Sequence, residues 1–263
     1  MCNDPSMTTT KPEPTGARSR IRFERGAKRV RAYLGGELVV DSTRPVLVWE
    51  VPYYPAYYVP LDDVRTELLE ADGGVAHSPS RGDGTTFTVR AGEREAPEAA
   101  WRYRDSPIEE LREMIRFDWD SMDAWFEEDE EVFTHPRSPY TRVDILPSSR
   151  HVRVEVGGTT VADSSSPRLL FETGLPVRYY LPKTHVRMDL LTPTETLSHC
   201  PYKGQAEWWS VRAADGVYED FAWSYRTPLP ESERIAGLVA FYNEKVDIYV
   251  DGALQERPVT KFS

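Results

Sequence analysis

Short stretches of alternating apolar and polar residues run through the second half of the chain and predict β-strands. Residues 151–156 alternate in this way, and the glycine pair at 157–158 favours a tight hairpin turn into residues 159–162. The same pattern predicts strands at 169–172, 177–181, 186–190, 205–213, 217–225, 240–242 and 246–250. A turn is expected at 182–185 and one short helix at 228–238. This half is therefore predicted to be mostly β.

The first half of the chain carries the same pattern at a constant offset of 122 positions. Residues 57–60 (YYVP) reappear as 179–182 (YYLP), and the glycine pair at 35–36 reappears at 157–158. Such self-similarity without gaps indicates an internal duplication, and hence two domains of one fold.

The offset grows after Tyr103, where the second copy gains about two residues. We therefore align Phe117 with Phe241, and residues 122–126 with residues 246–250. Residues 107–122 of the first copy look more helical than their counterpart, because their apolar residues recur at helical spacing.

The duplication divides the chain into four segments. We expect a disordered tail at residues 1–20, a first repeat domain at 21–133, a linker at 134–149 and a second repeat domain at 150–263. Three prolines within the linker favour an ordered, extended connection. Whether the two domains share a cleft or lie end to end stays open at this point.

Composition narrows the class of function. The formal net charge of -11 argues against binding to nucleic acid and to anionic membranes, and no apolar run approaches the roughly 18 residues of a membrane span. The two cysteines, Cys2 and Cys200, exclude a disulfide framework and a four-cysteine zinc site. We predict a cytoplasmic protein without a metal or cofactor, and the oligomeric state is open.

Polar and aromatic residues at equivalent positions of the two copies are the first candidates for chemistry. The pairs are Glu50 and Glu172, Tyr58 and Tyr180, Arg65 and Arg187, His77 and His199, Trp101 and Trp223, and Tyr103 and Tyr225. Function would explain their presence in both copies, but so would the fold that the copies share. A structural ion pair between Glu and Arg, and core packing of the Trp and Tyr residues, are the alternatives.

The segment from His199 to Gly204 is the sharpest motif. Cys200 lies beside His199 and near Lys203, an arrangement that can lower a thiol pKa and produce a nucleophile. Tyr202 and Lys203 could instead hold an anionic ligand. The first copy keeps His77 and a cation, Arg81, but lacks the thiol and the tyrosine. A ligand-contacting loop, a catalytic thiol and a purely structural loop are all compatible with this segment.

These residues resemble a known family. Residues 150–164 and the segments around His199–Gly204 and 222–225 are similar to the domain of unknown function 427 family, and residues 48–58 resemble the tandem form common in actinobacteria. The resemblance implies two tandem copies of a small β-tent-like domain with short helical segments, similar to methionine sulfoxide reductase B and the cereblon ligand-binding domain. Those relatives often bind zinc through paired cysteines that this chain lacks. A nucleotidyltransferase label has been attached to the family, but this chain shows no phosphate-binding loop.

Three classes of function follow. The leading hypothesis is a small-molecule binding module, with a nucleoside or imide held in an aromatic pocket of the second domain. The pocket residues would be Glu172, Tyr180, Arg187, Tyr202, Lys203, Trp208, Trp223 and Tyr225, together with His199. The second hypothesis is an enzyme that uses Cys200 or His199, and the third is a structural or interaction protein. The second domain is expected to hold the better pocket, because Ser78 and Ser80 replace Cys200 and Tyr202 in the first.

Overall fold

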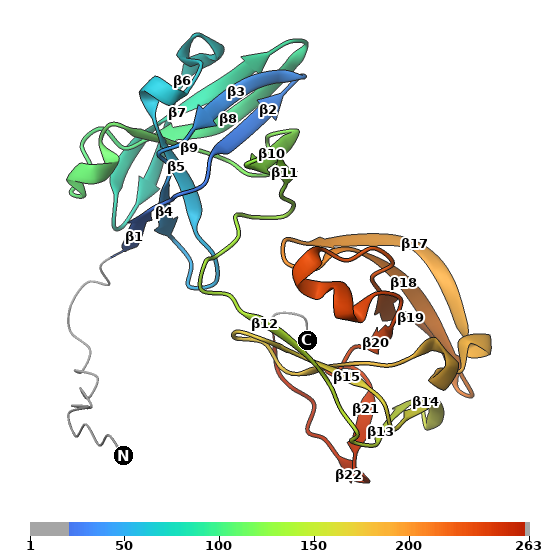
Figure 1. Ribbon diagram of the computed structural model, residues 1–263. Coiled ribbons are helices and arrows are strands. Elements are labelled where there is room, and N and C mark those ends of the chain that lie inside the picture. The colour runs from blue at the N-terminus through green and yellow to red at the C-terminus, as the bar shows by residue number, and fades with distance from the viewer. Residues whose placement is uncertain (1–20, 261–263) are drawn as a thin grey trace, which may run out of the picture.

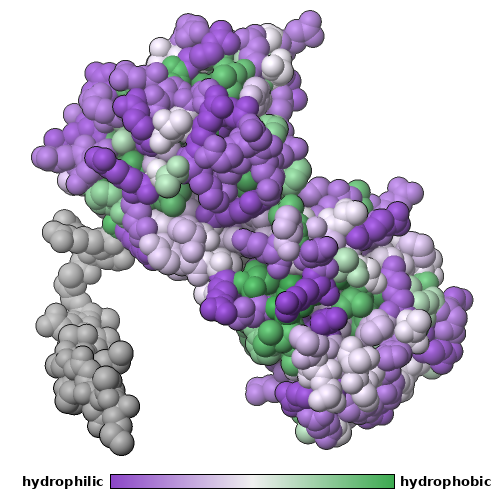
Figure 2. All heavy atoms as spheres, in the orientation of Figure 1, coloured by the Kyte–Doolittle hydropathy of each residue, from purple (hydrophilic) through white to green (hydrophobic). Residues whose placement is uncertain are grey.

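The two repeats form separate units that meet at a junction (Figure 1). The computed structural model describes residues 21–260, so the tail expected at residues 1–20 lies outside the described range. Hydrophilic residues cover most of the visible face of the first repeat, whereas hydrophobic atoms gather on the second repeat just below the junction (Figure 2).

The first repeat is built from strands and three single 3₁₀ turns. Its strands are β1 (Arg22–Arg25), β2 (Val30–Leu34), β3 (Glu37–Ser42), β4 (Val46–Trp49), β5 (Ala56–Pro60), β6 (Leu69–Ser78), β7 (Gly82–Ala91), β8 (Arg94–Arg102), β9 (Met114–Phe117), β10 (Ala124–Glu127) and β11 (Glu130–Glu131). The turns are η1 (Leu61–Asp63), η2 (Thr66–Leu68) and η3 (Glu109–Leu111).

The second repeat has the same elements in the same order. Its strands are β12 (Val143–Pro147), β13 (Val152–Val156), β14 (Thr159–Ser164), β15 (Arg168–Glu172), β16 (Arg178–Tyr180), β17 (Leu191–Cys200), β18 (Gly204–Ala213), β19 (Gly216–Ser224), β20 (Val239–Phe241), β21 (Asp247–Val250) and β22 (Ala253–Leu254). Its 3₁₀ segments are η4 (Lys183–His185), η5 (Met188–Leu190) and η6 (Pro230–Ile235).

Each repeat folds into a large and a small antiparallel sheet. The large sheet of the first repeat runs β1-β4-β5-β9-β8-β7-β6, and the small one runs β11-β10-β2-β3. The second repeat keeps both orders, although only the bridge between Leu181 and Val239 joins β16 to β20. The expected fold class, mostly β with two tandem β-tent-like copies and short helical segments, is confirmed.

Strand pairing corrects the sequence alignment of the two copies at the last long strand. Ala100 pairs with Phe117, and the equivalent Ala222 pairs with Phe241, which confirms that part of the alignment. In the next strand, however, Phe126 lies opposite Arg31 and Tyr249 lies opposite Arg153. Phe126 therefore corresponds to Tyr249 and not to Val250. Residues 122–126 match residues 245–249, so the alignment with residues 246–250 is wrong by one position.

Three further segments differ from the sequence prediction. Residues 186–190 end in the 3₁₀ turn η5 and form no strand, and residues 107–122 contain η3 and β9 with no longer helix. The ten-residue strand β17 was not predicted. It is a mostly exposed edge strand that carries Pro193, so burial imposes no alternation on its sequence.

Each repeat has its own pair of hydrophobic cores, and none of these cores merges the two repeats. Successive strand residues point to opposite faces of the large sheet, so Tyr179 packs against the core beneath the small sheet while Tyr180 enters the other core. In the first repeat Tyr57 and Tyr58 divide in the same way.

The connection between the repeats is shorter than the expected linker at 134–149. β12 pairs with β15 from Val143 to Pro147, as β1 pairs with β4 in the first repeat. The strand therefore belongs structurally to the second repeat. Residues 132–142, called the connecting segment below, span the distance between β11 and β12.

Separate cores predict that damage to one repeat stays local. Leu170 is completely buried, so Leu170→Ala should destabilise the second repeat by about 2–5 kcal/mol through lost burial and a cavity. Hydrogen exchange followed by mass spectrometry should speed up in β13–β21 and stay unchanged in β2–β10. Val48→Ala, at the equivalent position, should give the reverse pattern, and faster exchange in both repeats from either variant would contradict separate cores.

Candidate ligand-binding cleft between the repeats

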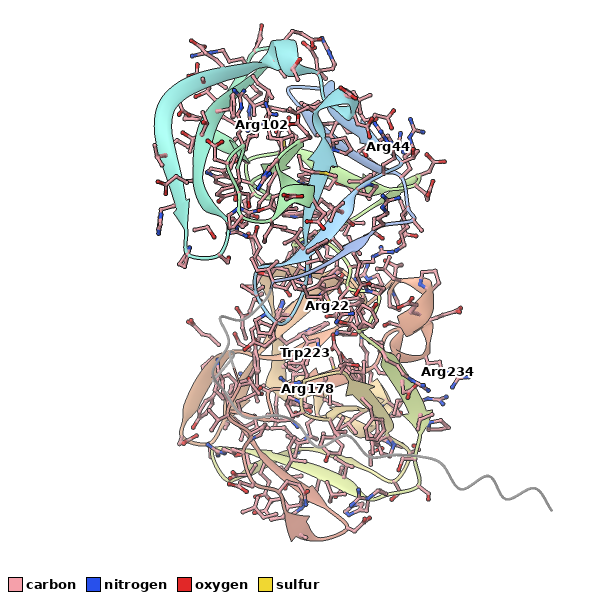
Figure 3. All side chains as sticks on the ribbon, turned by 90° about the vertical axis from the view of Figure 1, so that its left-hand side faces the viewer. Arg22, Arg44, Arg102, Arg178, Trp223 and Arg234 are labelled. Atoms are coloured by element: carbon pink, nitrogen blue, oxygen red, sulfur yellow. The ribbon has the colours of Figure 1, made fainter. Side chains whose placement is uncertain are left out.

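A cavity of about 770 Å³ lies where the two repeats meet. The first repeat, the connecting segment, the second repeat and the C-terminal residues up to Thr260 all contribute to its lining. We call it the junction cleft. Figure 3 shows Arg22 at this junction, with Trp223 and Arg178 lying deeper in the second repeat.

Equivalent loops of the two repeats line the junction cleft. In the first repeat Pro52, Tyr53 and Tyr54 lie on the loop between β4 and β5. In the second repeat residues 173–176 lie on the loop between β15 and β16. These loops stand at the same offset as the rest of the duplication, so the cleft is formed by corresponding parts of both copies.

Cation–π contacts of Arg22 join the first-repeat wall of the cleft to the connecting segment. The guanidinium carbon of Arg22 lies 4.5 Å from the ring centre of Trp49 and 3.9 Å from that of Tyr140. At these distances the faces of both rings attract the cation. Both Arg22 and the Tyr140 hydroxyl bind Glu24, each at 2.6 Å. The wall is therefore preformed.

Ring contacts through His135 connect the first repeat to the connecting segment and the second repeat. The rings of Tyr54 and His135 are nearly parallel, with centres 3.9 Å apart, and His135 also meets the edge of Tyr202. The Tyr202 hydroxyl accepts a hydrogen bond of 2.7 Å from the backbone N–H of Ser138. Tyr202 thereby ties the turn between β17 and β18 to the connecting segment.

Glu172 and Lys203 form a buried ion pair at the second-repeat wall. The Lys203 ammonium lies 2.5 Å from Oε2 of Glu172, and only 10% and 8% of the two side chains are exposed. Burial acts to lower the pKa of Lys203, but the nearby Cys200, Glu172 and Tyr180 outweigh it and raise the pKa. Lys203 is therefore held as a cation, and Glu172 also lines the junction cleft.

The aromatic residues expected to form a pocket in the second repeat form a core instead. Tyr180, Trp223 and Tyr225 are buried together, and the indole N–H of Trp223 donates a 3.1 Å hydrogen bond to the Tyr180 hydroxyl. Trp208 is half-buried and packs on Trp223 and Tyr242. None of the four expected wall residues lines the junction cleft, whereas Glu172 and Tyr202 do.

The two arginines paired by the duplication do not reach this region. Arg187 is exposed and binds Asp189, and Arg65 is exposed and binds Glu37 and Glu67. The duplicated glutamates pair with other cations, Glu50 with Arg81 and Arg116 and Glu172 with Lys203, so an ion pair of either one with Arg65 or Arg187 is not formed.

His199 and Cys200 point in different directions. Neighbouring residues of a strand face opposite sides of the sheet, and both lie at the end of β17. His199 is exposed and stacks on Phe133, with ring centres 4.8 Å apart, while its carbonyl accepts a hydrogen bond from Thr134. Cys200 is half-buried and influences the pKa of Lys203 from the inner side. Adjacency in sequence therefore creates no thiol–imidazole pair here.

The first-repeat equivalents form a closed polar network. Glu50 forms ion pairs with Arg81 and Arg116 and accepts a 2.7 Å hydrogen bond from the Tyr58 hydroxyl. Arg116 lies over the ring of Trp101, and Arg81 lies over that of Tyr103. His77 is exposed and contacts Asp83.

A model of a domain of unknown function, DUF427, matches the chain twice, over residues 22–128 and 144–252. The chain belongs to the DUF427 family. The two matched segments coincide with the two repeats, so the tandem resemblance is confirmed, while the actinobacterial form stays a prediction. No curated protein matches the chain.

Two further features of this DUF427 protein bear on its chemistry. Within residues 21–260, no three His, Cys, Asp or Glu side chains gather in a way that could hold a metal ion. The same residues contain no helix with the length and apolar character needed to cross a membrane.

Sequence reasoning missed most of the DUF427 cleft. Arg22, Trp49, Tyr54, His135 and Tyr140 line it and were not predicted as site residues. The density of Tyr and Pro at 52–58 was the available signal, but it does not say which part of the other repeat faces it. Within the acidic run at 127–131, Glu127 is 4% exposed and binds Lys28 and the Tyr57 hydroxyl.

Buried tyrosines predict alkaline instability of the DUF427 domains. Burial raises the pKa of Tyr180 from 10.0 to about 12, so an unfolded chain loses this proton at lower pH than the native one. This contribution is fully present below pH 10.0 and should be lost as the pH rises through about 12. Urea unfolding across this range should show a shallower decline in stability for Tyr180→Phe than for the wild type. Equal slopes would contradict the shifted pKa.

Proposed function

We propose that this tandem DUF427 protein binds one flat small molecule in the junction cleft. The observation that carries the proposal is the aromatic lining of a cavity of about 770 Å³ to which both repeats contribute. Known small-molecule sites have volumes of roughly 300–1,000 Å³ and combine aromatic walls with a few polar groups. The site moves from the second repeat, where the sequence suggested it, to the junction.

The charges at the cleft favour an uncharged ligand. Two lining residues are of a charged type (Arg, Lys, Asp or Glu), namely Arg22 and Glu172. Each already forms an ion pair, Arg22 with Glu24 and Glu172 with Lys203. A phosphate-binding site usually offers several free cations or a glycine-rich loop before a helix. A heterocycle such as a nucleoside base or a cyclic imide therefore suits this lining better than a polyphosphate.

The duplication explains why the ligand would bind between the repeats. Each repeat supplies the equivalent loop, and neither loop alone encloses the volume. The proposal therefore includes one ligand per chain. It also includes a cytoplasmic setting, in keeping with the free thiol of Cys200.

The stacked wall provides a direct test. Tyr54→Ala removes the ring that lies on His135, so affinity for a flat ligand should fall about tenfold, the scale expected for loss of one stacking partner. Isothermal titration with a panel of nucleosides and cyclic imides measures this effect.

Tyr218→Ala is the matched control, because Tyr218 lies on β19 outside the cleft lining and bonds to Asp215. It should leave affinity unchanged. Absence of binding across the panel, or equal loss in both variants, would refute a ligand site at the junction.

A further inference from the structure

The duplicated glutamates occupy equivalent positions with unequal surroundings. Glu50 comes directly after β4, and Glu172 is the last residue of β15. The two glutamates therefore lie at the same position of the two large sheets. Both meet a cation from the equivalent hairpin turn, Arg81 in one repeat and Lys203 in the other. The shared ion pair therefore belongs to the fold, and any difference between the two carboxylates reflects divergence after duplication.

Glu50 is contacted by three groups of its own repeat, all at Oε1. Besides Arg81, Arg116 Nε lies 3.4 Å from its Oε1, and the Tyr58 hydroxyl donates to the same atom at 2.7 Å. Three groups thus converge on one carboxylate, and Glu50 is not among the residues that line the junction cleft.

The second repeat has lost two of these three partners. Arg116 pairs with Trp101 across β8 and β9, and the same position opposite Trp223 is Ala240. An alanine cannot replace the guanidinium. The Tyr180 hydroxyl, equivalent to that of Tyr58, is instead bonded to the indole of Trp223. The hydrogen bond from Lys203 uses Oε2 of Glu172, which leaves the carboxylate facing the cleft with acceptor capacity.

We propose that Glu172 is the polar anchor of the junction cleft and accepts a hydrogen bond from an N–H group on the edge of a flat, uncharged heterocycle. This inference rests on the proposed function and specifies its ligand class, an amino- or imide-bearing ring. Lys203 binds Oε2 of Glu172 and neutralises the charge of the carboxylate. The cleft therefore selects a neutral hydrogen-bond donor over a cation. A carboxylate accepts strong hydrogen bonds, and a ligand without the donor would leave it unpaired in a largely buried site.

Methylated probes test the anchor without altering the protein. Adenosine and uridine present an amino group and an imide N–H, and N6,N6-dimethyladenosine and 3-methyluridine lack those donors. Titration of the wild type should show at least tenfold weaker binding of the methylated form of whichever nucleoside binds. Equal affinities for the two forms would overturn the anchor.

Glu172→Gln tests the residue itself. Lys203 should hold the amide oxygen, so the NH₂ group would face the cleft and turn an acceptor into a donor. The variant should bind the unmethylated nucleoside at least tenfold more weakly and lose the preference over the methylated one. Glu50→Gln is the matched control, because it removes the equivalent ion pair outside the cleft and should keep both affinity and preference.

The two proposals fail in different ways. If a nucleoside binds and Tyr54→Ala weakens binding, but Glu172→Gln keeps the preference for the unmethylated form, the cleft stands and the anchor is wrong. If neither adenosine, uridine nor a cyclic imide binds the wild type, this ligand class is wrong. Binding by a cyclic imide that is lost in Tyr54→Ala would still keep the cleft in place.

Discussion

In each repeat a glutamate forms a buried ion pair with a cation on the hairpin turn after the first long strand, β6 or β17. This ion pair organises the repeat. Removing charges from water is costly, so each carboxylate needs its cation close by, and that need brings the end of β15 to the turn between β17 and β18. The same turn carries Tyr202, whose hydroxyl binds the connecting segment at Ser138. Tyr202 and Lys203 are neighbours on this turn, so the link to the connecting segment lies directly beside the pair formed by Glu172 and Lys203.

The duplication places equivalent loops of the two copies at one cleft. The loops that follow β4 and β15 are equivalent in sequence position, and together they line one cleft. Divergence then acted on the partners of the shared glutamate. Arginine at position 116 closes the network of the first repeat, whereas alanine at position 240 opens that of the second. Glu50 is thus held by groups of its own repeat, whereas Glu172 lines the cleft.

The geometry of β17 also limits what the neighbouring histidine and thiol can do. A strand sends adjacent side chains to opposite faces, so His199 packs on Phe133 at the junction while Cys200 turns toward Lys203. In the first repeat a serine takes the place of the thiol and the histidine is exposed. The histidine in the second copy therefore contributes to the contact between the second repeat and the connecting segment.

The sequence by itself determined the duplication, the mostly β fold and most strands, because burial of one sheet face imposes a period of two on the residues. It could not show the edge strand β17, where little is buried and no period is required. It singled out Glu172 through its counterpart Glu50, and Tyr202 and Lys203 through the segment from His199 to Gly204, but not their partners. Only the tertiary structure decided that Tyr180 and Trp223 are core and that the cleft lies at the junction. Those facts depend on which sheet face a residue occupies and on how two domains pack, and contacts between distant segments set both.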